Sequence, residues 1–483
     1  MSRIAIVTTL LILLISLTGF SQQEVQDTAE VQFKIDNYLK DAKELHNIPG
    51  LAVAVIQDGD VIYEKYLGKA SLESDEQVDE NTLFRIFSAT KLITATAVFQ
   101  LIQDGKLNQE DKLSTHLSHM PLHWQDIQIK NLLSHSSGLP DFIRYESTLT
   151  DVELLEKLAS DKMEFETGSQ FRYNQTNYWL LGQIIEKLTG NTFDKYVLDS
   201  QFKEANSGVL FSSNSQEEIA NRATRYFYNG KFKSFEKDKN NSGKRGHPGN
   251  GLNISLKTLI EWNIALDNNQ LLDKATKAAM WTPFDFTNKK DDFLHGWAQH
   301  KINSLNSIGF TGGNLAGFRK FVNNGTTIIL LSNGYEIPAY DIIINDISRI
   351  TIPELRSKSL TLEENVLQFA LSSQLEMATS SYSALKKENR GYSFDNLKWN
   401  INSIGNSLAY QETPIKARQM YEFNLKMNPD WWLSAAGIAE TYEMQKDSVR
   451  TIINYKKAIL LNTDNQWGYN EHMEDLIQKL KKE

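Results

Sequence analysis

Ser88 and Lys91, three positions apart, are the residues of this sequence best suited to covalent chemistry. Residues i and i+3 share one helix face, so a lysine amine at this spacing reaches the serine hydroxyl. A neutral amine there would accept the seryl proton, and burial lowers a lysine pKa enough for that role. The spacing alone is weakly specific, because Ser-x-x-Lys also occurs at Ser200/Lys203, Ser234/Lys237 and Ser383/Lys386.

The composition of the 483-residue chain restricts what else it can do. It contains no cysteine, which excludes disulfides, thiolate nucleophiles and cysteine-ligated metals. Its 51 Lys+Arg against 60 Asp+Glu give a net charge of −9, which disfavours nucleic-acid binding. The sequence has no Gly-x-Ser-x-Gly, His-Glu-x-x-His or P-loop motif. We expect no cofactor, no metal and no nucleic-acid partner.

The elements that must position these residues follow from periodicity. Two apolar runs around the turn Asp58-Gly59-Asp60 predict a β-hairpin, preceded by a helical stretch at Val31–His46. Helical patterns dominate from Ala89 to Gly190, and strand-like runs return after Gly296. The expected strands are Leu51–Gln57, Val61–Leu67, Gly309–Thr311, Phe318–Asn323 and Thr326–Leu331. Strands at both ends with helices between them predict an antiparallel sheet in an α+β fold.

Four ordered segments resemble the class C β-lactamase-related serine hydrolases. They are Asn81–Lys106 around the nucleophile, Asn131–Pro140 (NLLSHSSGLP), Gly168–Gly190 with a tyrosine loop, and Gly309–Phe318 (GFTGGNLAGF). The resemblance covers roughly residues 30–350. It implies a β-lactamase/transpeptidase-like fold, an antiparallel sheet flanked by helices, and acyl transfer through a serine.

The resemblance also implies site residues. Ser88 would be the acylated nucleophile, Lys91 its base or proton relay, and Tyr173 a partner in proton transfer. The backbone N–H groups of Ser88 and Gly313 would form the oxyanion hole. The substrate side would be lined by Gln175, Phe310, Thr311 and Gly312. The alternative for Tyr173 is an aromatic that only packs, since Phe171, Tyr178 and Trp179 are its neighbours.

Two positions depart from the family pattern. Phe310 stands where the family has Lys or His, and Gln175 stands where it has Asn. The missing cation commonly orients a substrate carboxylate, which phenylalanine cannot do. We therefore expect β-lactams and D-Ala-D-Ala peptides to be poor substrates, and esters or amides without a carboxylate anchor to be better ones. Arg319 is an alternative source of the missing charge.

The histidines are weaker candidates for catalysis or metal binding. In the family the loop that holds His135 is structural, so we interpret His135 as a hydrogen-bonded scaffold residue. His116, His119 and His123 have metal-like spacing, but Pro121 breaks the helix that would align them. We expect these three residues to lie in a solvated loop.

The chain divides into three predicted parts: a signal peptide at 1–21, a serine hydrolase domain at 22–352 and a helical domain at 353–483. In the last part, Tyr421–Asn428 and Tyr455–Asn462 are similar segments 34 residues apart (455 − 421). A 34-residue helical period resembles tetratricopeptide repeats, and a generic helical appendage is the alternative.

These observations predict an exported hydrolase, periplasmic or extracellular, acting on a small-molecule or peptide ester or amide, with no stable membrane span after signal cleavage. Alternatives are a D,D-carboxypeptidase, D-aminopeptidase or β-lactamase acting on cell-wall-like material. A rival of another class is an inactive binding or sensor protein. The helical repeats would bind a protein partner.

Overall fold

A computed structural model describes most of the chain after residue 27. The described residues are 28–203, 208–229, 232–289, 291–303, 305–336, 340–356, 362–388, 391–410, 414–463, 465 and 469–481. The predicted signal peptide at 1–21 lies outside them. Within these ranges, no helix has the length and apolar character needed to span a bilayer.

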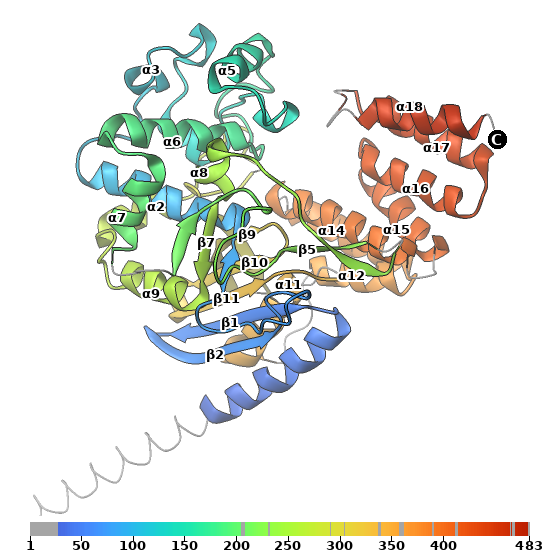
Figure 1. The fold of residues 1–483 in the computed structure, drawn as a ribbon, viewed down its shortest axis with the longest axis horizontal. Coiled ribbons are helices and arrows are strands. Elements are labelled where there is room, and N and C mark those ends of the chain that lie inside the picture. Colours follow the sequence, from blue (N-terminus) through green and yellow to red (C-terminus); the bar gives the residue numbers. More distant parts are fainter. Residues whose placement is uncertain are drawn as a thin grey trace, which may run out of the picture.

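A six-stranded antiparallel sheet joins segments from distant parts of the chain (Figure 1). Its strands, in spatial order, are β2 (Asp60–Gly68), β1 (Gly50–Gln57), β11 (Thr326–Ser332), β10 (Ala316–Phe321), β9 (Leu305–Gly312) and β8 (Ala298–Ile302). β1 pairs with β11 from Leu51↔Ser332 to Gln57↔Thr326. The predicted hairpin and the α+β class are therefore confirmed.

The sheet differs from the expected strands at three places. The strand expected at Gly309–Thr311 is longer and spans Leu305–Gly312. The expected strand Phe318–Asn323 ends at Phe321, because Val322–Asn324 form a 3₁₀ turn closed by Gly325 at φ +63°. Glycine adopts this left-handed conformation without steric cost, so the chain reverses there. β8 was not predicted, because its sequence AQHKI lacks an apolar run.

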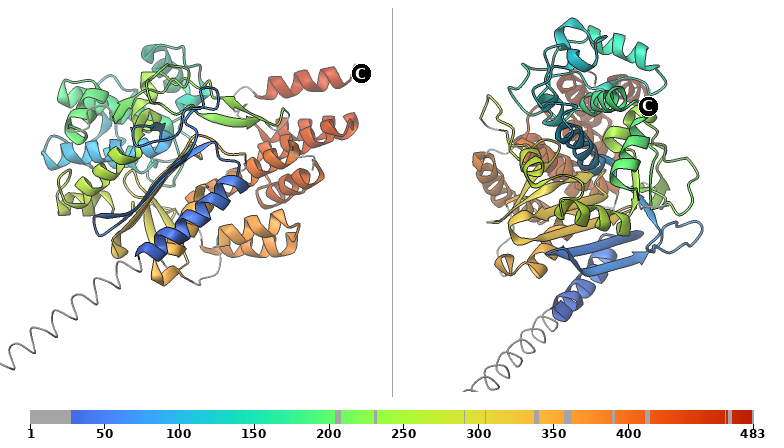
Figure 2. Two further views of the ribbon diagram at one scale, coloured as in Figure 1. Left: turned by 60° about the horizontal axis from the view of Figure 1, so that its bottom comes forward. Right: turned by 90° about the vertical axis from the view of Figure 1, so that its left-hand side faces the viewer.

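The two faces of the sheet belong to different cores. Along β1, Leu51, Val53 and Val55 join a cluster with the helix at 28–45 and α11 (Tyr340–Thr351). Ala52 and Ala54 point to the opposite cluster, which the other helices fill. This alternation is the period of two of a β-strand. Figure 2 shows the N-terminal helix on one side of the sheet and the helical lobe on the other.

The helical lobe covers the second face. Its helices are α2 (Thr90–Gln103), α3 (Leu113–His116), α4 (Ile129–Leu133), α5 (Asp151–Ser160), α6 (Gln175–Thr189), α7 (Phe193–Gln201), α8 (His247–Asn250), α9 (Leu256–Asp267) and α10 (Lys274–Met280). The lobe also holds a three-stranded sheet, β3 (Leu83–Arg85), β7 (Leu252–Ser255) and β4 (Val209–Phe211). A separate hairpin of β5 (Tyr226–Asn229) and β6 (Ser234–Lys237) lies at the end of β11, where the Tyr226 N–H donates to the Asn333 carbonyl at 2.7 Å. Sequence analysis predicted none of these five strands.

The C-terminal helices form a separate core that runs from Val366 to Ile477. They are α12 (Leu362–Leu371), α13 (Leu375–Glu388), α14 (Gly391–Tyr410), α15 (Pro414–Met427), α16 (Trp432–Met444), α17 (Ser448–Leu461) and α18 (Tyr469–Leu480). Both ends of α17 lie 34 residues after those of α15 (448 − 414 and 461 − 427), so the helices follow the predicted period.

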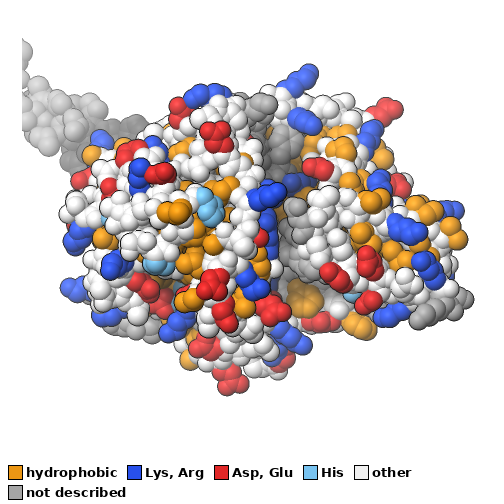
Figure 3. Space-filling view, turned by 90° about the horizontal axis from the view of Figure 1, so that it is seen from above, with side chains coloured by type: hydrophobic (Ala, Val, Ile, Leu, Met, Phe, Trp, Pro, Cys, Tyr) orange, Lys and Arg blue, Asp and Glu red, His pale blue; other side chains and the backbone are white. Residues whose placement is uncertain are grey.

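The C-terminal helices are tied to the main body by polar contacts. Arg349 of α11 pairs with Glu364 of α12 at 2.5 Å, and Ser407 of α14 donates to the Glu336 carbonyl at 2.8 Å. Seen from above, a groove separates the two bodies, and Lys and Arg side chains gather along it (Figure 3). Leu355 still packs with the sheet, whereas Val366 packs with the C-terminal helices. The domain boundary at 352/353 stays a prediction.

Candidate active site

Ser88 lies in a 3₁₀ turn, η1 (Phe87–Ala89), between β3 and α2. Phe87 has φ +45°, a conformation that costs energy for a residue with a side chain. The guanidinium groups of Arg85 and Arg225 lie 4.5 Å and 4.7 Å from its ring centroid and hold it in place. Ser88 itself is partly exposed, although the residues on either side are buried. The turn therefore presents the hydroxyl of one serine to solvent at the start of a buried helix.

The Tyr173 hydroxyl donates a hydrogen bond to Ser88 Oγ at 2.8 Å. Tyr173 directly precedes Asn174, the residue that caps α6 by accepting from the Asn177 N–H. On one side its ring meets that of His135, with 4.6 Å between centroids. Burial raises the pKa of Tyr173 to about 12, and its hydrogen bond with Ser88 opposes the rise. The phenol is therefore protonated at neutral pH and serves as a donor to Ser88.

Lys91 is completely buried in the first turn of α2. Its Nζ donates to Gln175 Oε1 at 3.0 Å and to the Gly249 carbonyl at 2.9 Å. The same atom lies 4.8 Å and 4.9 Å from the ring centroids of Tyr173 and Tyr178. Burial lowers the pKa of Lys91 to about 7, although the Asp141 carboxylate favours the ammonium form. Lys91 is thus a base matched to neutral pH, next to the tyrosine that contacts Ser88.

Asp141 is the nearby acidic residue that sequence analysis missed. Its carboxyl group accepts from the backbone N–H groups of Gln175 at 3.1 Å and Ile143 at 3.2 Å. Burial raises the pKa of Asp141 to about 6, although both N–H groups favour the carboxylate. The residue therefore fixes the start of α6, where Tyr173 and Gln175 lie. Asp141 directly follows the Gly-Leu-Pro segment of a recognised motif, and this position in the sequence could have indicated its role.

The turn after β9 lies directly against Ser88. A Cβ atom added to Gly312 would approach the Ile86 carbonyl oxygen to 1.8 Å, and one added to Gly313 would approach the Phe87 ring to 2.7 Å. Gly313 is exposed and has φ +56°. Only glycine allows this close approach of two backbones, so the sequence brings the Gly313 backbone close to η1.

Phe310 lies beneath the site rather than on its surface. Its side chain is 1% exposed and packs against the rings of Tyr173 and Phe293, each at 6.1 Å between centroids. The neighbouring Thr311 is 8% exposed. The position where the family carries a cation is therefore an apolar support for Tyr173.

Arg319 occupies the opposite face of the sheet from Phe310. In the register of β9 and β10, Phe310 pairs with Phe318 and Gly309 with Arg319, so the two side chains point to different faces. The Arg319 guanidinium donates to Thr311 Oγ1 at 2.8 Å and pairs with Asp341 at 2.6 Å. Its charge is balanced by that carboxylate, and its side chain is 3% exposed.

The position of His135 fits a scaffold role, whereas the expectation of a solvated loop is wrong for His116, which ends α3 with a side chain that is 9% exposed. His135 is fully buried at φ +56°, and its Nδ1 accepts from the Asn174 backbone N–H at 3.2 Å. His116 contacts Asp111 at 2.9 Å, whereas His119 and His123 are exposed. In the part of the chain that the structure describes, no group of three residues could hold a metal.

The fold and the site together define the class of protein. The family model "Beta-lactamase" matches residues 35–346, well over half of the chain, and the chain belongs to this family of serine hydrolases. A curated relative, Protein flp of Staphylococcus aureus (strain MRSA252), is 29% identical over 185 residues, covering 36% of this chain and 37% of that protein. Penicillin-binding protein 4* of Bacillus subtilis (strain 168) is 26% identical over 322 residues, covering 62% and 71%.

Solved structures share the fold. The octameric penicillin-binding protein homologue from Pyrococcus abyssi matches with a TM-score of 0.60 and 20% identity, covering 69% of this chain and 81% of its own. A D-amino acid amidase from Ochrobactrum anthropi SV3 matches with a TM-score of 0.57 and 18% identity, covering 69% and 100%. The predicted β-lactamase/transpeptidase-like architecture is therefore confirmed, together with an additional helical region at the C-terminus.

Proposed function

We propose that this protein hydrolyses an ester or amide through an acyl-enzyme on Ser88, with Lys91 and Tyr173 as its proton shuttle. The observation that carries the proposal is the 2.8 Å hydrogen bond from the Tyr173 hydroxyl to Ser88 Oγ, beside a completely buried lysine. Nucleophilic catalysis requires such a hydroxyl with a base close by.

The hydrogen-bond inventory of Lys91 supports its role as the base. A neutral amine has two N–H donors and one lone pair. The two donors are used by Gln175 Oε1 and the Gly249 carbonyl, which leaves the lone pair for a proton. Because the Lys91 pKa is near 7 and that of Tyr173 is about 12, the lysine is the better proton acceptor at neutral pH. The seryl proton would reach it by way of the tyrosine oxygen.

The oxyanion would form between two backbone N–H groups. Ser88 begins the approach to α2, so its N–H lies at a helix start, where negative charge is favoured. Gly313 is exposed and lies against Phe87. Donors fixed at this point would stabilise the charge that develops on the substrate carbonyl in each tetrahedral intermediate. Water would then release the acyl group, with the same shuttle taking its proton.

The lining of the site favours substrates that lack a carboxylate anchor. Phe310 offers no charge, and the charge of Arg319 is balanced by Asp341 behind the sheet. Turnover of nitrocefin, a β-lactam with a carboxylate, should be compared with that of a short p-nitrophenyl ester. We expect a higher kcat/KM on the ester. Efficient nitrocefin hydrolysis with little on the ester would instead favour a β-lactamase or D,D-carboxypeptidase.

Export and partner binding belong to the same proposal. An apolar run with a positive start at Arg3 supports cleavage after residue 21 and a location outside the cytoplasm. The mass of the protein purified from its native host tests this, since the mature chain should begin at Gln22. The 34-residue period of the C-terminal helices supports a tetratricopeptide-like domain that binds a protein partner.

A further inference from the structure

The one-turn helix α8 (His247–Asn250) carries the backbone acceptor that orients Lys91. The Gly249 carbonyl accepts from Lys91 Nζ at 2.9 Å, and the Pro248 carbonyl accepts from Thr94 Oγ1 at 2.7 Å. A single turn does not hold its own position, because short helices are unstable without outside contacts. Whatever fixes α8 therefore also fixes the position of the lysine amine.

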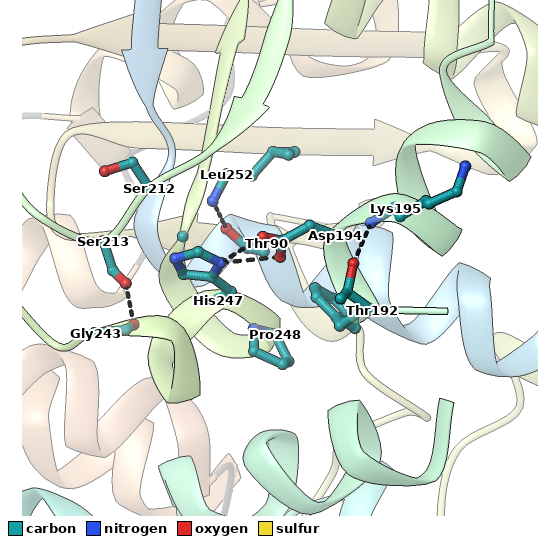
Figure 4. Close-up of polar contacts among 12 residues, drawn as sticks. Thr90, Thr192, Asp194, Lys195, Ser212, Ser213, Gly243, His247, Pro248 and Leu252 are labelled. Atoms are coloured by element: carbon teal, nitrogen blue, oxygen red, sulfur yellow. Dashed lines mark hydrogen bonds and ion pairs between the residues drawn. The ribbon is translucent and has the colours of Figure 1, made fainter. Parts of the chain in front are cut away.

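A hydrogen bond between a histidine and a carboxylate holds α8 at its first residue. The Nδ1 atom of His247 lies 2.9 Å and 3.0 Å from the two carboxylate oxygens of Asp194, in the first turn of α7 (Figure 4). A carboxylate only accepts hydrogen bonds, so the imidazole proton lies on Nδ1. The Phe211 ring stacks on the imidazole at 5.9 Å and 22°. The pair thus fixes both the place and the plane of His247.

The other end of α8 is held by the guanidinium of Arg85. Arg85 Nε donates to the Asn250 carbonyl at 3.2 Å, and Arg85 Nη2 donates to Asn250 Oδ1 at 3.2 Å. Gly249 lies between these two anchors. A Cβ atom at that position would lie 3.3 Å from Lys91 Nζ, so the backbone is already in close contact with the amine. A shift of α8 by a fraction of an ångström would change the Lys91 hydrogen bond.

The histidine–aspartate pair does not itself form a second nucleophilic site. In Figure 4, the Ser212 and Ser213 hydroxyls point away from the imidazole. Ser212 Oγ donates to Glu217 at 2.5 Å, and Ser213 Oγ donates to the Gly243 carbonyl. Neither of these two hydroxyls is therefore activated by His247, and the pair acts on the position of α8.

We infer that Asp194 and His247 are positioning residues: they hold the Gly249 carbonyl in place, and this carbonyl orients Lys91. The inference rests on the proposed role of Lys91 in activating Ser88. According to this inference, the orientation of Lys91 depends on Asp194 and His247, which are not themselves reacting groups. Loss of the pair should slow the chemical step and leave substrate binding unchanged, because neither side chain contacts Ser88, Tyr173 or the turn at Gly313.

The test compares Asp194→Ala with Asp199→Ala in the full-length protein. Asp199 lies on the same helix and forms an exposed pair with Lys195, so it is a matched control. The readouts are the rate of Ser88 labelling by a fluorophosphonate probe, and kcat and KM on a p-nitrophenyl ester. Misplacing a catalytic group costs about 10- to 100-fold. We expect that loss in kcat and labelling for Asp194→Ala, with KM within about twofold, and none for Asp199→Ala.

A conservative variant distinguishes orientation from general stability. Asp194→Asn keeps an acceptor for the His247 N–H and should retain activity within about threefold of the unmodified protein. If Asp194→Ala does not fold, His247→Phe replaces it, because this variant keeps the ring stacked on Phe211 but removes the bond. A folded Asp194→Ala or His247→Phe with unchanged kcat and labelling rate would overturn the inference. Absence of Ser88 labelling in the unmodified protein would overturn the proposed function itself.

Discussion

The active site and the C-terminal helices both bury polar side chains, but of different kinds. In the helices, the polar side chains with no solvent exposure among the described residues are all uncharged: Asn424, Ser434, Thr441 and Thr451. Asn424 donates to the Lys398 carbonyl at 2.9 Å and accepts from Asn428 at 2.9 Å. In the active site, the completely buried side chains include the amine of Lys91, whose hydrogen bonds go to an amide oxygen and a backbone carbonyl rather than to a carboxylate.

This difference indicates that the active site lowers the stability of the fold by keeping a buried, reactive amine. A buried neutral amide with satisfied hydrogen bonds stabilises the fold. A buried lysine whose pKa falls to about 7 destabilises the fold at neutral pH, because the unfolded chain binds the proton more tightly. The completely buried polar groups of the C-terminal helices therefore stabilise the fold, whereas the active site keeps a completely buried amine that can gain and lose a proton near neutral pH. An exception among the C-terminal helices is the Glu440 carboxyl of α16, whose pKa burial raises to about 7. The following predictions test this contrast.

Replacing Lys91 should separate activity from stability most strongly. Lys91→Met removes the base, so kcat/KM on an ester should fall by about 10²- to 10⁴-fold. The same change removes a buried amine, so the melting temperature at neutral pH should rise. The gain is limited to a few kcal/mol, on the order of 1.4 kcal/mol for each unit by which burial lowers the pKa. Ester kinetics and thermal unfolding measure the two effects.

A second buried lysine provides the control for this variant. Lys277 is 8% exposed and donates to the Leu266 and Asp267 carbonyls at 2.6 Å and 3.0 Å, far from the reacting groups in the sequence. Lys277→Met should leave kcat/KM unchanged. Equal loss of activity in both variants would mean that a buried lysine supports the fold rather than the reaction.

The pH dependence should show the protonation of Lys91. Because the neutral amine is the base and its pKa is about 7, kcat/KM should rise about tenfold per pH unit below that value and level off above it. Stability should follow the same group in a defined direction. The unfolded chain binds the extra proton between about pH 10 and pH 7, so this contribution to stability decreases as pH falls through that window and is constant below it. A rate that is flat from pH 5 to pH 9 would contradict the assignment.

Replacing Asn424 should lower stability without changing activity, and its effect should be the smallest of these predictions. Asn424→Ala removes the side-chain hydrogen bonds to the Lys398 carbonyl and from the Asn428 amide, which costs about 1–3 kcal/mol of unfolding free energy. The kcat on an ester should not change. Asn454→Ala is the control, since Asn454 is partly exposed and donates to the Arg450 carbonyl in its own helix. Unfolding in denaturant, followed by circular dichroism, compares the two.

The two regions also differ in how much of them sequence analysis could predict. In the C-terminal region, similar segments 34 residues apart predict helices, and α15 and α17 lie there with the same offset; that they form tetratricopeptide-like repeats stays a prediction. In the main body, the sheet could be expected because apolar runs lay at both ends. Ser88, Lys91 and Tyr173 could be named as candidates because they lie within recognisable motifs, and their catalytic roles stay a prediction.

What sequence analysis missed depends on contacts between distant positions. Gly249 lies 158 residues from the lysine that it holds, in a Pro-Gly turn that indicates only a change of chain direction. Strands β3 and β4 are three residues long, too short for a period of two to be recognised. The face on which Arg319 lies depends on the register of β9 and β10, which only the folded sheet defines.

The central claim is that Ser88 is a nucleophile activated by its neighbours. The most direct measurement is mass spectrometry of the protein after reaction with a fluorophosphonate. We expect one label, on the peptide that contains Ser88, with labelling slowed by at least about 10²-fold in Tyr173→Phe and Lys91→Met and absent in Ser88→Ala. A folded protein that takes up no label at Ser88 would contradict the account and favour a binding protein that has kept the fold without its chemistry.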